Sequence, residues 1–229
     1  MSIFSVVATP IGNLQDITLR ALDVLKKSDL ILCEDTRMTK RLLDHHLINV
    51  PTKSYHTHSK LDRKDEIVEM LRSGKNLALV SDAGTPGISD PGIELVKYLR
   101  EEMSSELSEG SLKIESIPGP SALTASIAIA GVYCGDFIFL GFLPHKKGRE
   151  TLFKEISQSE RTVIFYESPH RIMKTLDSLI QHCPMKKVTI CRELTKVFEE
   201  VVAGSAQEVK NYFEKNIEKI KGEFVVLVS

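Results

Sequence analysis

Apolar segments of strand length alternate with amphipathic segments of helical periodicity along the first part of the chain. The expected helices include "ITLRALDVLKKS", "TRMTKRLLDHH" and "GIELVKYLREEM", and the expected strands are "IFSVVAT", "LILCE", "TKSYHT", "NLALVSD" and "LKIESIP". Strands that alternate with helices are joined by crossovers, and crossovers build parallel sheets. The alternation therefore predicts an α/β lobe with a largely parallel sheet.

The segment "VYCGD" at residues 132–136 interrupts this pattern and predicts a boundary between lobes of residues 1–131 and 132–229. In the second lobe, the expected strands "KKVTICREL" and "FEEVVAGS" follow one another with no helix between them, so we expect a mixed sheet. The predicted fold class is α/β, with two α/β lobes and a cleft between them. Locally, we expect Thr36 to be an N-cap residue and "SSELSEGS" to form a polar hairpin or loop.

The charge balance limits the partners that the chain can bind through its overall charge. Lys and Arg number 30 and Asp and Glu number 31, which gives a net charge of -1. This balance argues against a generally basic surface for nucleic acid, but it leaves room for a local basic patch. The segment "LPHKKGRE" supplies such a patch with Lys146, Lys147 and Arg149, unless it is only a solvated loop.

The cysteines and histidines give no metal-site or disulfide spacing. The 4 cysteines include no C-x-x-C pair, so free thiols in a reducing cytosol are expected. His56 and His58 share one face of an expected strand, but no further ligand follows at useful spacing, so no metal site is predicted. We see no signal peptide and no apolar run of the roughly 18 residues that a membrane span needs, and we therefore expect a cytoplasmic protein with no membrane partner.

Loops rich in Gly, Pro, Asp and Thr follow the expected strands of the first lobe. In open α/β sheets, ligands bind beyond the carboxyl ends of the strands, so these loops are expected to meet at one ligand-binding rim. The alternative is that they are only sharp connections from strand to helix. The P-loop and the dinucleotide fingerprint are both missing, so the ligand is not expected to be held mainly through a pyrophosphate. The loops are "ATPIGNL", "CEDTRMTKR", "SDAGTPGISDPG" and "PGPSALTAS".

Together with segments of the second lobe, these loops resemble the tetrapyrrole methylase superfamily, the class III S-adenosylmethionine (SAM) methyltransferases. Within it, they are most similar to the branch that methylates ribosomal RNA, because the first loop reads "TPIGN" where the porphyrin branch typically has G-x-G-P-G. The resemblance covers essentially the whole chain. The further segments that carry it are "FLGFLP", "FYESPHRI", "CRELTK" and "KGEFVVLV".

The resemblance implies transfer of a methyl group from SAM to the ribose 2′-hydroxyl of a cytidine in the 16S rRNA of the small ribosomal subunit, by a homodimer. Many relatives carry a further C-terminal helical segment, so we expect any RNA contact made there to be absent or replaced. The alternatives are a tetrapyrrole methyltransferase of the same fold and a non-catalytic SAM- or RNA-binding module. The implied cofactor-binding residues are Ile11, Asp82, Gly84, Thr85, Ser121, Ala122, Tyr166, Arg192 and Glu223.

A second group of residues is expected to act on the acceptor hydroxyl, because acids, bases and cations gather at strand ends. The general base among them is left open. Asp82 could instead be a turn aspartate, the charges of "CEDTR" a solvated helix face, and His170 a cap or a core hydrogen-bonder. The candidate catalytic residues are Glu34, Asp35, Arg37, Glu167, His170 and Lys196, with Arg192 beside them.

Overall fold

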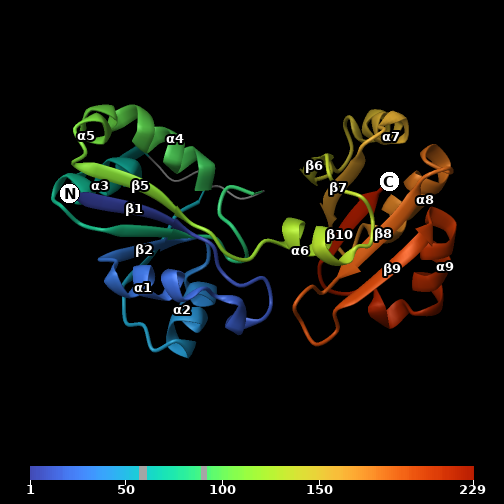
Figure 1. Ribbon diagram of the computed structural model, residues 1–229, viewed down its shortest axis with the longest axis horizontal. Helices are drawn as coiled ribbons and strands as arrows, with labels where there is room; N and C mark the ends of the chain where they lie inside the picture. The colour runs from blue at the N-terminus through green and yellow to red at the C-terminus, as the bar shows by residue number, and fades with distance from the viewer. Residues whose placement is uncertain (57–60, 89–91) are drawn as a thin grey trace. The chain divides into compact units, whose positions relative to one another are not determined.

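The computed structural model describes residues 1–56, 61–88 and 92–229, and contacts divide the chain into two compact units, Met1–Ser121 and Ala122–Ser229. The sequence predicts the boundary about one helix later, between residues 131 and 132. The two boundaries differ because helix α6 (Ala122–Ile129) packs on strand β10 (Phe224–Val228) and is grouped with the second unit. Figure 1 shows the two α/β units in blue to green and in green to red.

The first unit is built on a parallel sheet of strand order β3-β2-β4-β1-β5. Helices cover both faces of this sheet, so the unit has two hydrophobic cores. One core lies between the sheet and helices α1 and α2, and the other lies between the sheet and helices α3 and α4. The prediction of a parallel α/β sheet is confirmed. The strands are β1 (Ser2–Val7), β2 (Leu30–Cys33), β3 (Thr52–Ser54), β4 (Leu77–Val80) and β5 (Leu112–Ile117). The helices are η1 (Leu14–Asp16), α1 (Leu19–Lys27), α2 (Thr36–His45), α3 (Leu61–Arg72), α4 (Gly92–Glu102) and α5 (Ser104–Ser108).

Two local predictions in this unit are wrong. Asp35, and not Thr36, caps α2: its backbone is extended, with φ of -109° and ψ of 111°, and its carboxylate accepts from the N–H of Arg37. The segment "SSELSEGS" is not a hairpin, because it contains helix α5. Leu107 of that helix packs against the adjacent core, which stabilises a turn of helix that the polar composition conceals.

The second unit is built on a mixed sheet of strand order β6-β7-β10-β8-β9, in which β6 and β7 pair in parallel and the other pairs are antiparallel. The predicted mixed sheet is confirmed. The remaining strands are β6 (Phe137–Phe142), β7 (Thr162–Glu167), β8 (Lys187–Arg192) and β9 (Glu200–Ser205). The remaining helices are α7 (Arg149–Gln158), α8 (Ile172–His182), α9 (Ala206–Lys215) and η2 (Ile217–Lys219).

Helices α7, α8 and α9 fill the core on one face of this second sheet. Ile190 points into that core, so its neighbour Cys191 points to the opposite face, where its Sγ lies 3.8 Å from the carbonyl oxygen of Ser126 on α6. All the cysteines are free thiols, as the sequence predicts. Among the described residues, no helix is long and apolar enough to cross a membrane.

Candidate functional site

Three loops of the first unit are tied together at the carboxyl end of its sheet. Thr9, after β1, exchanges two backbone hydrogen bonds with Gly84, after β4, at N···O distances of 2.9 and 3.0 Å. The hydroxyl of Thr9 also donates to the carbonyl of Ser81 at 3.1 Å, and the hydroxyl of Thr85 donates to the carbonyl of Pro120, after β5, at 3.0 Å. The predicted convergence of these loops on one rim is therefore confirmed.

The glycines of the loop after β4 are required by its backbone. Gly84 has a φ of +83° and Gly87 a φ of +92°, which side-chain-bearing residues rarely adopt. A Cβ at Gly84 would also lie 3.3 Å from Cγ2 of Ile11 and 3.7 Å from the carbonyl oxygen of Pro120. The loop thus keeps a bare backbone next to the carboxylate of Asp82, and residues 89–91 at its far end lie outside the described residues.

The loop after β2 joins this rim through Asp35. The backbone N–H of Asp35 donates to Oδ1 of Asp82 at 2.9 Å. Its own carboxylate accepts from Nε of Arg37 at 3.1 Å, from Nη2 at 2.6 Å and from the backbone N–H of the same arginine at 2.8 Å. The side-chain and then the backbone hydrogen bonds from Arg37 lower the pKa of Asp35 to about 2. Asp35 is therefore an ionised cap and an anchor for Arg37, and a weak proton acceptor at neutral pH.

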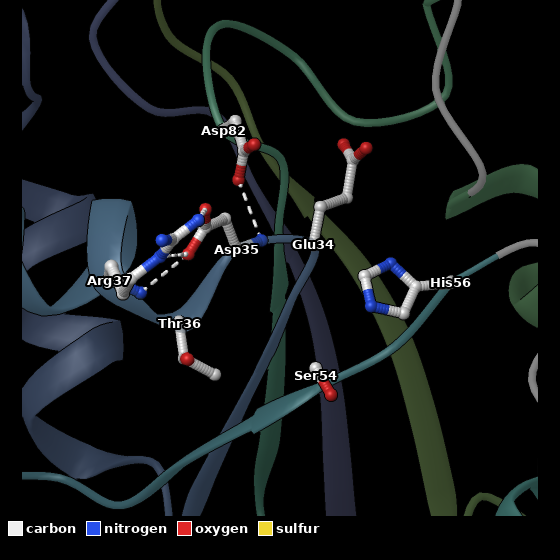
Figure 2. A pocket seen from close by; sticks show the side chains of 7 residues that line it. All are labelled: Glu34, Asp35, Thr36, Arg37, Ser54, His56 and Asp82. Atoms are coloured by element: carbon white, nitrogen blue, oxygen red, sulfur yellow. Dashed lines mark hydrogen bonds and ion pairs between the residues drawn. The ribbon is translucent and has the colours of Figure 1, made fainter.

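These groups line a pocket of about 420 Å³ at the ends of β2, β3 and β4. Figure 2 shows the side chains of Glu34 and His56 extending into the same space, with Asp82 above the backbone of Asp35. Three of the lining side chains are carboxylates, so the pocket favours cations and hydrogen-bond donors and disfavours phosphate. The lining residues are Glu34, Asp35, Thr36, Arg37, Ser54, His56 and Asp82.

In the second unit, the carboxylate of Glu167 is fully buried in a network of donors. It accepts from the hydroxyl of Thr175 at 2.6 Å and from the backbone N–H of Ser168 at 2.9 Å. It also pairs with Nε of Arg171 at 2.7 Å and with Nη2 of Arg149 at 3.6 Å. This geometry gives Glu167 a structural role at the end of β7, and it draws Arg149 inward from the expected basic patch.

The loop "CRELTK" after β8 is held by a second network. Nη1 of the buried Arg192 donates to the carbonyl of Phe198 at 3.0 Å, so this arginine fixes the loop from within. Lys196 pairs with Glu193 at 2.9 Å and with Glu223 at 3.0 Å. Burial alone would lower the pKa of Lys196, but the hydrogen bonds to these two carboxylates raise it overall.

The backbone of this loop adopts uncommon conformations. Glu193 has a φ of +52° and Thr195 a φ of +65°, and non-glycine residues with positive φ are often found at functional sites. Elsewhere in the unit, Tyr166 packs edge-on between Phe139 and Phe142, with ring centroids 5.0 and 5.5 Å away.

Known proteins match the chain over nearly all of its length. The family model described as Tetrapyrrole (Corrin/Porphyrin) Methylases matches residues 4–210. This chain belongs to the tetrapyrrole methylase family. Among its relatives, a protein of Thermotoga maritima is 42% identical over 98% of this chain and 96% of its own, and one of Synechocystis is 43% identical over 100% and 79%. Both are named ribosomal RNA small subunit methyltransferase I.

A solved tetrapyrrole methylase has the same fold as this chain. The uroporphyrin III C-methyltransferase from Thermus thermophilus aligns with a TM-score of 0.66 at 16% identity, covering 99% of this chain and 97% of the other. The prediction of a tetrapyrrole-methylase-like fold in two α/β lobes is therefore confirmed.

The structure brings together some of the residues that the sequence singles out for a tetrapyrrole methylase site. Glu34, Asp35 and Arg37 share one pocket with Asp82. In the second unit, Glu167 is buried, Lys196 is paired with two carboxylates and His170 is exposed on the turn after β7. The cofactor roles of Tyr166, Arg192 and Glu223 stay predictions that rest on the resemblance.

Sequence reasoning missed His56 as a member of this pocket. It considered His56 only with His58 as a metal pair, and His58 lies outside the described residues. Within the described part of the chain, no group of three or more His, Cys, Asp or Glu residues is placed to hold a metal ion. The signal that could have found His56 is its place near the end of the expected strand "TKSYHT", since the structure pairs β3 with β2, and Glu34 and Asp35 follow β2.

Proposed function

We propose that this chain is a SAM-dependent methyltransferase that modifies the ribose 2′-hydroxyl of a cytidine in the 16S rRNA of the small ribosomal subunit. The observation that carries the proposal is the similarity to proteins named ribosomal RNA small subunit methyltransferase I, at 42% and 43% identity over 98% and 100% of this chain. Similarity of that extent covers both units of the chain.

The rim of the first unit fits SAM by its chemistry. SAM carries a sulfonium and an ammonium, and the carboxylate of Asp82 is a suitable partner for a cation that leaves water. Gly84 and Gly87, which have positive φ, carry no side chain, so a ligand can approach the backbone of this loop closely. When bound, SAM supplies an electrophilic methyl group. The residues of this rim that would hold it are Ile11, Asp82, Gly84, Thr85 and Ser121, with Ala122 following them.

The acid-rich pocket fits the acceptor. Carboxylates accept hydrogen bonds from the hydroxyl groups of a ribose, and they keep phosphates toward the outside of the pocket. The side chain of Arg37 is 89% exposed, and its pairing with Asp35 leaves further guanidinium N–H groups for a phosphate. The residues of the pocket would thus orient a ribose hydroxyl, and correct orientation alone can supply much of a rate enhancement.

The partners follow from the same proposal. The exposed Arg41, Lys146 and Lys147 would contact RNA phosphates. A chain of net charge -1 needs such local cations to bind RNA. The substrate would place the protein in the cytoplasm, and we propose that it acts as a homodimer.

A tetrapyrrole methyltransferase is the second candidate, because the fold of this chain is that of the uroporphyrin III C-methyltransferase. The pocket argues against it, since tetrapyrrole precursors bear many carboxylates and three carboxylates line the pocket.

Transfer of a labelled methyl group from SAM separates the candidates. The purified protein is incubated with SAM and either small ribosomal subunits lacking the modification or a uroporphyrin-type tetrapyrrole. We expect label in 16S rRNA and none in the tetrapyrrole. Label in the tetrapyrrole alone would replace the proposal, and SAM binding without transfer to either would indicate a binding module.

A further inference from the structure

The loop between β6 and α7, residues 143–148, is buried at one end and exposed at its tip, and we call it the basic loop. Leu143 is 2% exposed and packs in the core of the second unit, whereas Lys146 and Lys147 are exposed. The N–H of Arg149 donates to the carbonyl of Lys146 at 3.3 Å and closes the turn into α7. The placement of the two lysines therefore depends on what holds the backbone of this loop.

Two arginine side chains bind the backbone of the basic loop. Nη1 of Arg171 donates to the carbonyl of Leu143 at 2.8 Å, and Nη1 of Arg149 donates to the carbonyl of Pro144 at 3.2 Å. Arg149 begins α7 and Arg171 is the N-cap residue of α8, so the loop is tied to two helices. Both arginine side chains are only 16% exposed, which limits competition by water for these hydrogen bonds.

The buried carboxylate of Glu167 orients both arginines. Its Oε1 pairs with Nε of Arg171 at 2.7 Å, and its Oε2 lies 3.6 Å from Nη2 of Arg149. The hydroxyl of Thr175 donates to Oε2 of Glu167 at 2.6 Å and accepts from Nη2 of Arg149 at 2.7 Å. Each planar guanidinium thus binds this centre with one N–H and a loop carbonyl with another. A lysine, which is a point charge on a flexible stem, cannot reproduce that geometry.

The lysines at the tip of the basic loop are available to an anion. In the ranges that the structure describes, neither Lys146 nor Lys147 has a carboxylate within salt-bridge distance. Other lysines of the same unit, Lys196, Lys210 and Lys219, each pair with one. An exposed and unneutralised pair of lysines suits the phosphates of a nucleic acid.

We propose that Arg171, oriented by Glu167, is a positioning residue for the RNA substrate, because it holds the basic loop so that Lys146 and Lys147 meet phosphates. This inference rests on the proposed methylation of ribosomal RNA. A loop that is fixed before binding loses less conformational freedom on binding, which strengthens each contact it makes. Arg171 acts through the loop, since its Nε and Nη1 bind Glu167 and Leu143.

The test replaces Arg171 by Lys, which keeps the charge and removes the fork geometry. Phosphate contacts of two lysines are at stake, so we expect subunit affinity to fall about tenfold and the slope of log affinity against log salt to decrease by about 1–2. Because the formal charge is unchanged, a purely electrostatic role of Arg171 predicts no change in that slope. Arg161→Lys is the matched control, since Arg161 is an exposed arginine at the start of β7.

Two further readouts separate positioning of the loop from a general structural role. In methylation of small ribosomal subunits, KM for the subunits should rise with affinity loss, while kcat and the SAM dissociation constant stay within about twofold. The effects of Arg171→Lys and of the double variant Lys146→Ala with Lys147→Ala should also be non-additive. Once both lysines are neutralised, Arg171→Lys should weaken subunit binding by less than about twofold further.

An unchanged affinity and salt slope in folded Arg171→Lys would overturn the inference, and so would fully additive effects. If Arg171→Lys does not fold, Thr175→Val decides in its place, because it removes the hydroxyl that joins Glu167 and Arg149 with little change of shape. We expect a smaller loss of subunit affinity with a lowered salt slope, and an unchanged slope would overturn the inference. A wild-type protein that transfers no methyl group to the subunits would refute the proposed function itself, whereas normal transfer with an unaffected Arg171→Lys would refute only the role of the loop.

Discussion

Replacing Glu167 by Gln should destabilise the second unit much more than it affects chemistry. The carboxylate is fully buried and has four partners, of which Arg149 and Arg171 are cations with side chains only 16% exposed. Glutamine keeps one acceptor oxygen for Thr175 or Ser168, but it removes the charge and turns an amide NH₂ toward donors. Removing one member of a buried ion pair costs about 3–5 kcal/mol, and we expect a loss of free energy of unfolding in that range.

Urea denaturation followed by circular dichroism measures this loss, and an unchanged slope with denaturant would show that the unfolding reaction is the same. Glu150→Gln on α7 is the matched control, because Glu150 and its partner Lys154 are 70% and 61% exposed and such surface pairs contribute little. Below its unfolding transition, Glu167→Gln should bind SAM and turn over at close to the wild-type rate. A stability within about 1 kcal/mol of wild type, together with a 100-fold loss of turnover, would refute the structural role and make Glu167 a contact of the reacting groups.

Three further predictions concern the ligands. Gly84→Ala and Gly74→Ala should each lose roughly 1–2 kcal/mol of stability, because both glycines have positive φ. Only Gly84→Ala should weaken SAM binding in calorimetry; equal SAM affinities of the two variants would exclude the loop after β4 from the cofactor site. Asp82→Asn should weaken SAM binding at least tenfold through the lost charge, whereas Asp136→Asn, at an exposed aspartate outside the rim, should not; a wild-type affinity in Asp82→Asn would exclude the carboxylate as a cation partner. Neutralising Arg41, Lys146 and Lys147 together should reduce the slope of log affinity for small subunits against log salt by about 2–3, with SAM affinity unchanged; an unaltered slope would remove these residues from the RNA-binding surface.

The sequence predicts the architecture well where the cause is local. Alternating apolar and amphipathic segments are sufficient to predict the parallel sheet of the first unit. Adjacent strands with no helix between them are sufficient to predict the mixed sheet of the second. The loops "SDAGTPG" and "CEDTR" could be placed at one rim because the ends of parallel strands meet at the same edge.

The sequence is least informative where distant residues decide. Glu167 looks like a candidate acid at a strand end, and no local pattern shows that Thr175 on α8, Arg171 at the N-cap of α8 and Arg149 on α7 enclose it. Helix α5 depends on the packing of Leu107 and not on its polar sequence. His56 carries no motif of its own, and its place in the pocket depends on the register that sets the end of β3 beside the end of β2.

The most direct test of the account is to locate the methyl group that the protein transfers to 16S rRNA. Small subunits that have been incubated with the protein and SAM are hydrolysed in alkali, and the fragments are mapped by primer extension and mass spectrometry. The account predicts one cytidine at which the chain resists cleavage, because a methylated 2′-oxygen cannot attack the neighbouring phosphate. Cleavage at that position, with the methyl group found on the base, would contradict the assignment of the ribose hydroxyl as the acceptor.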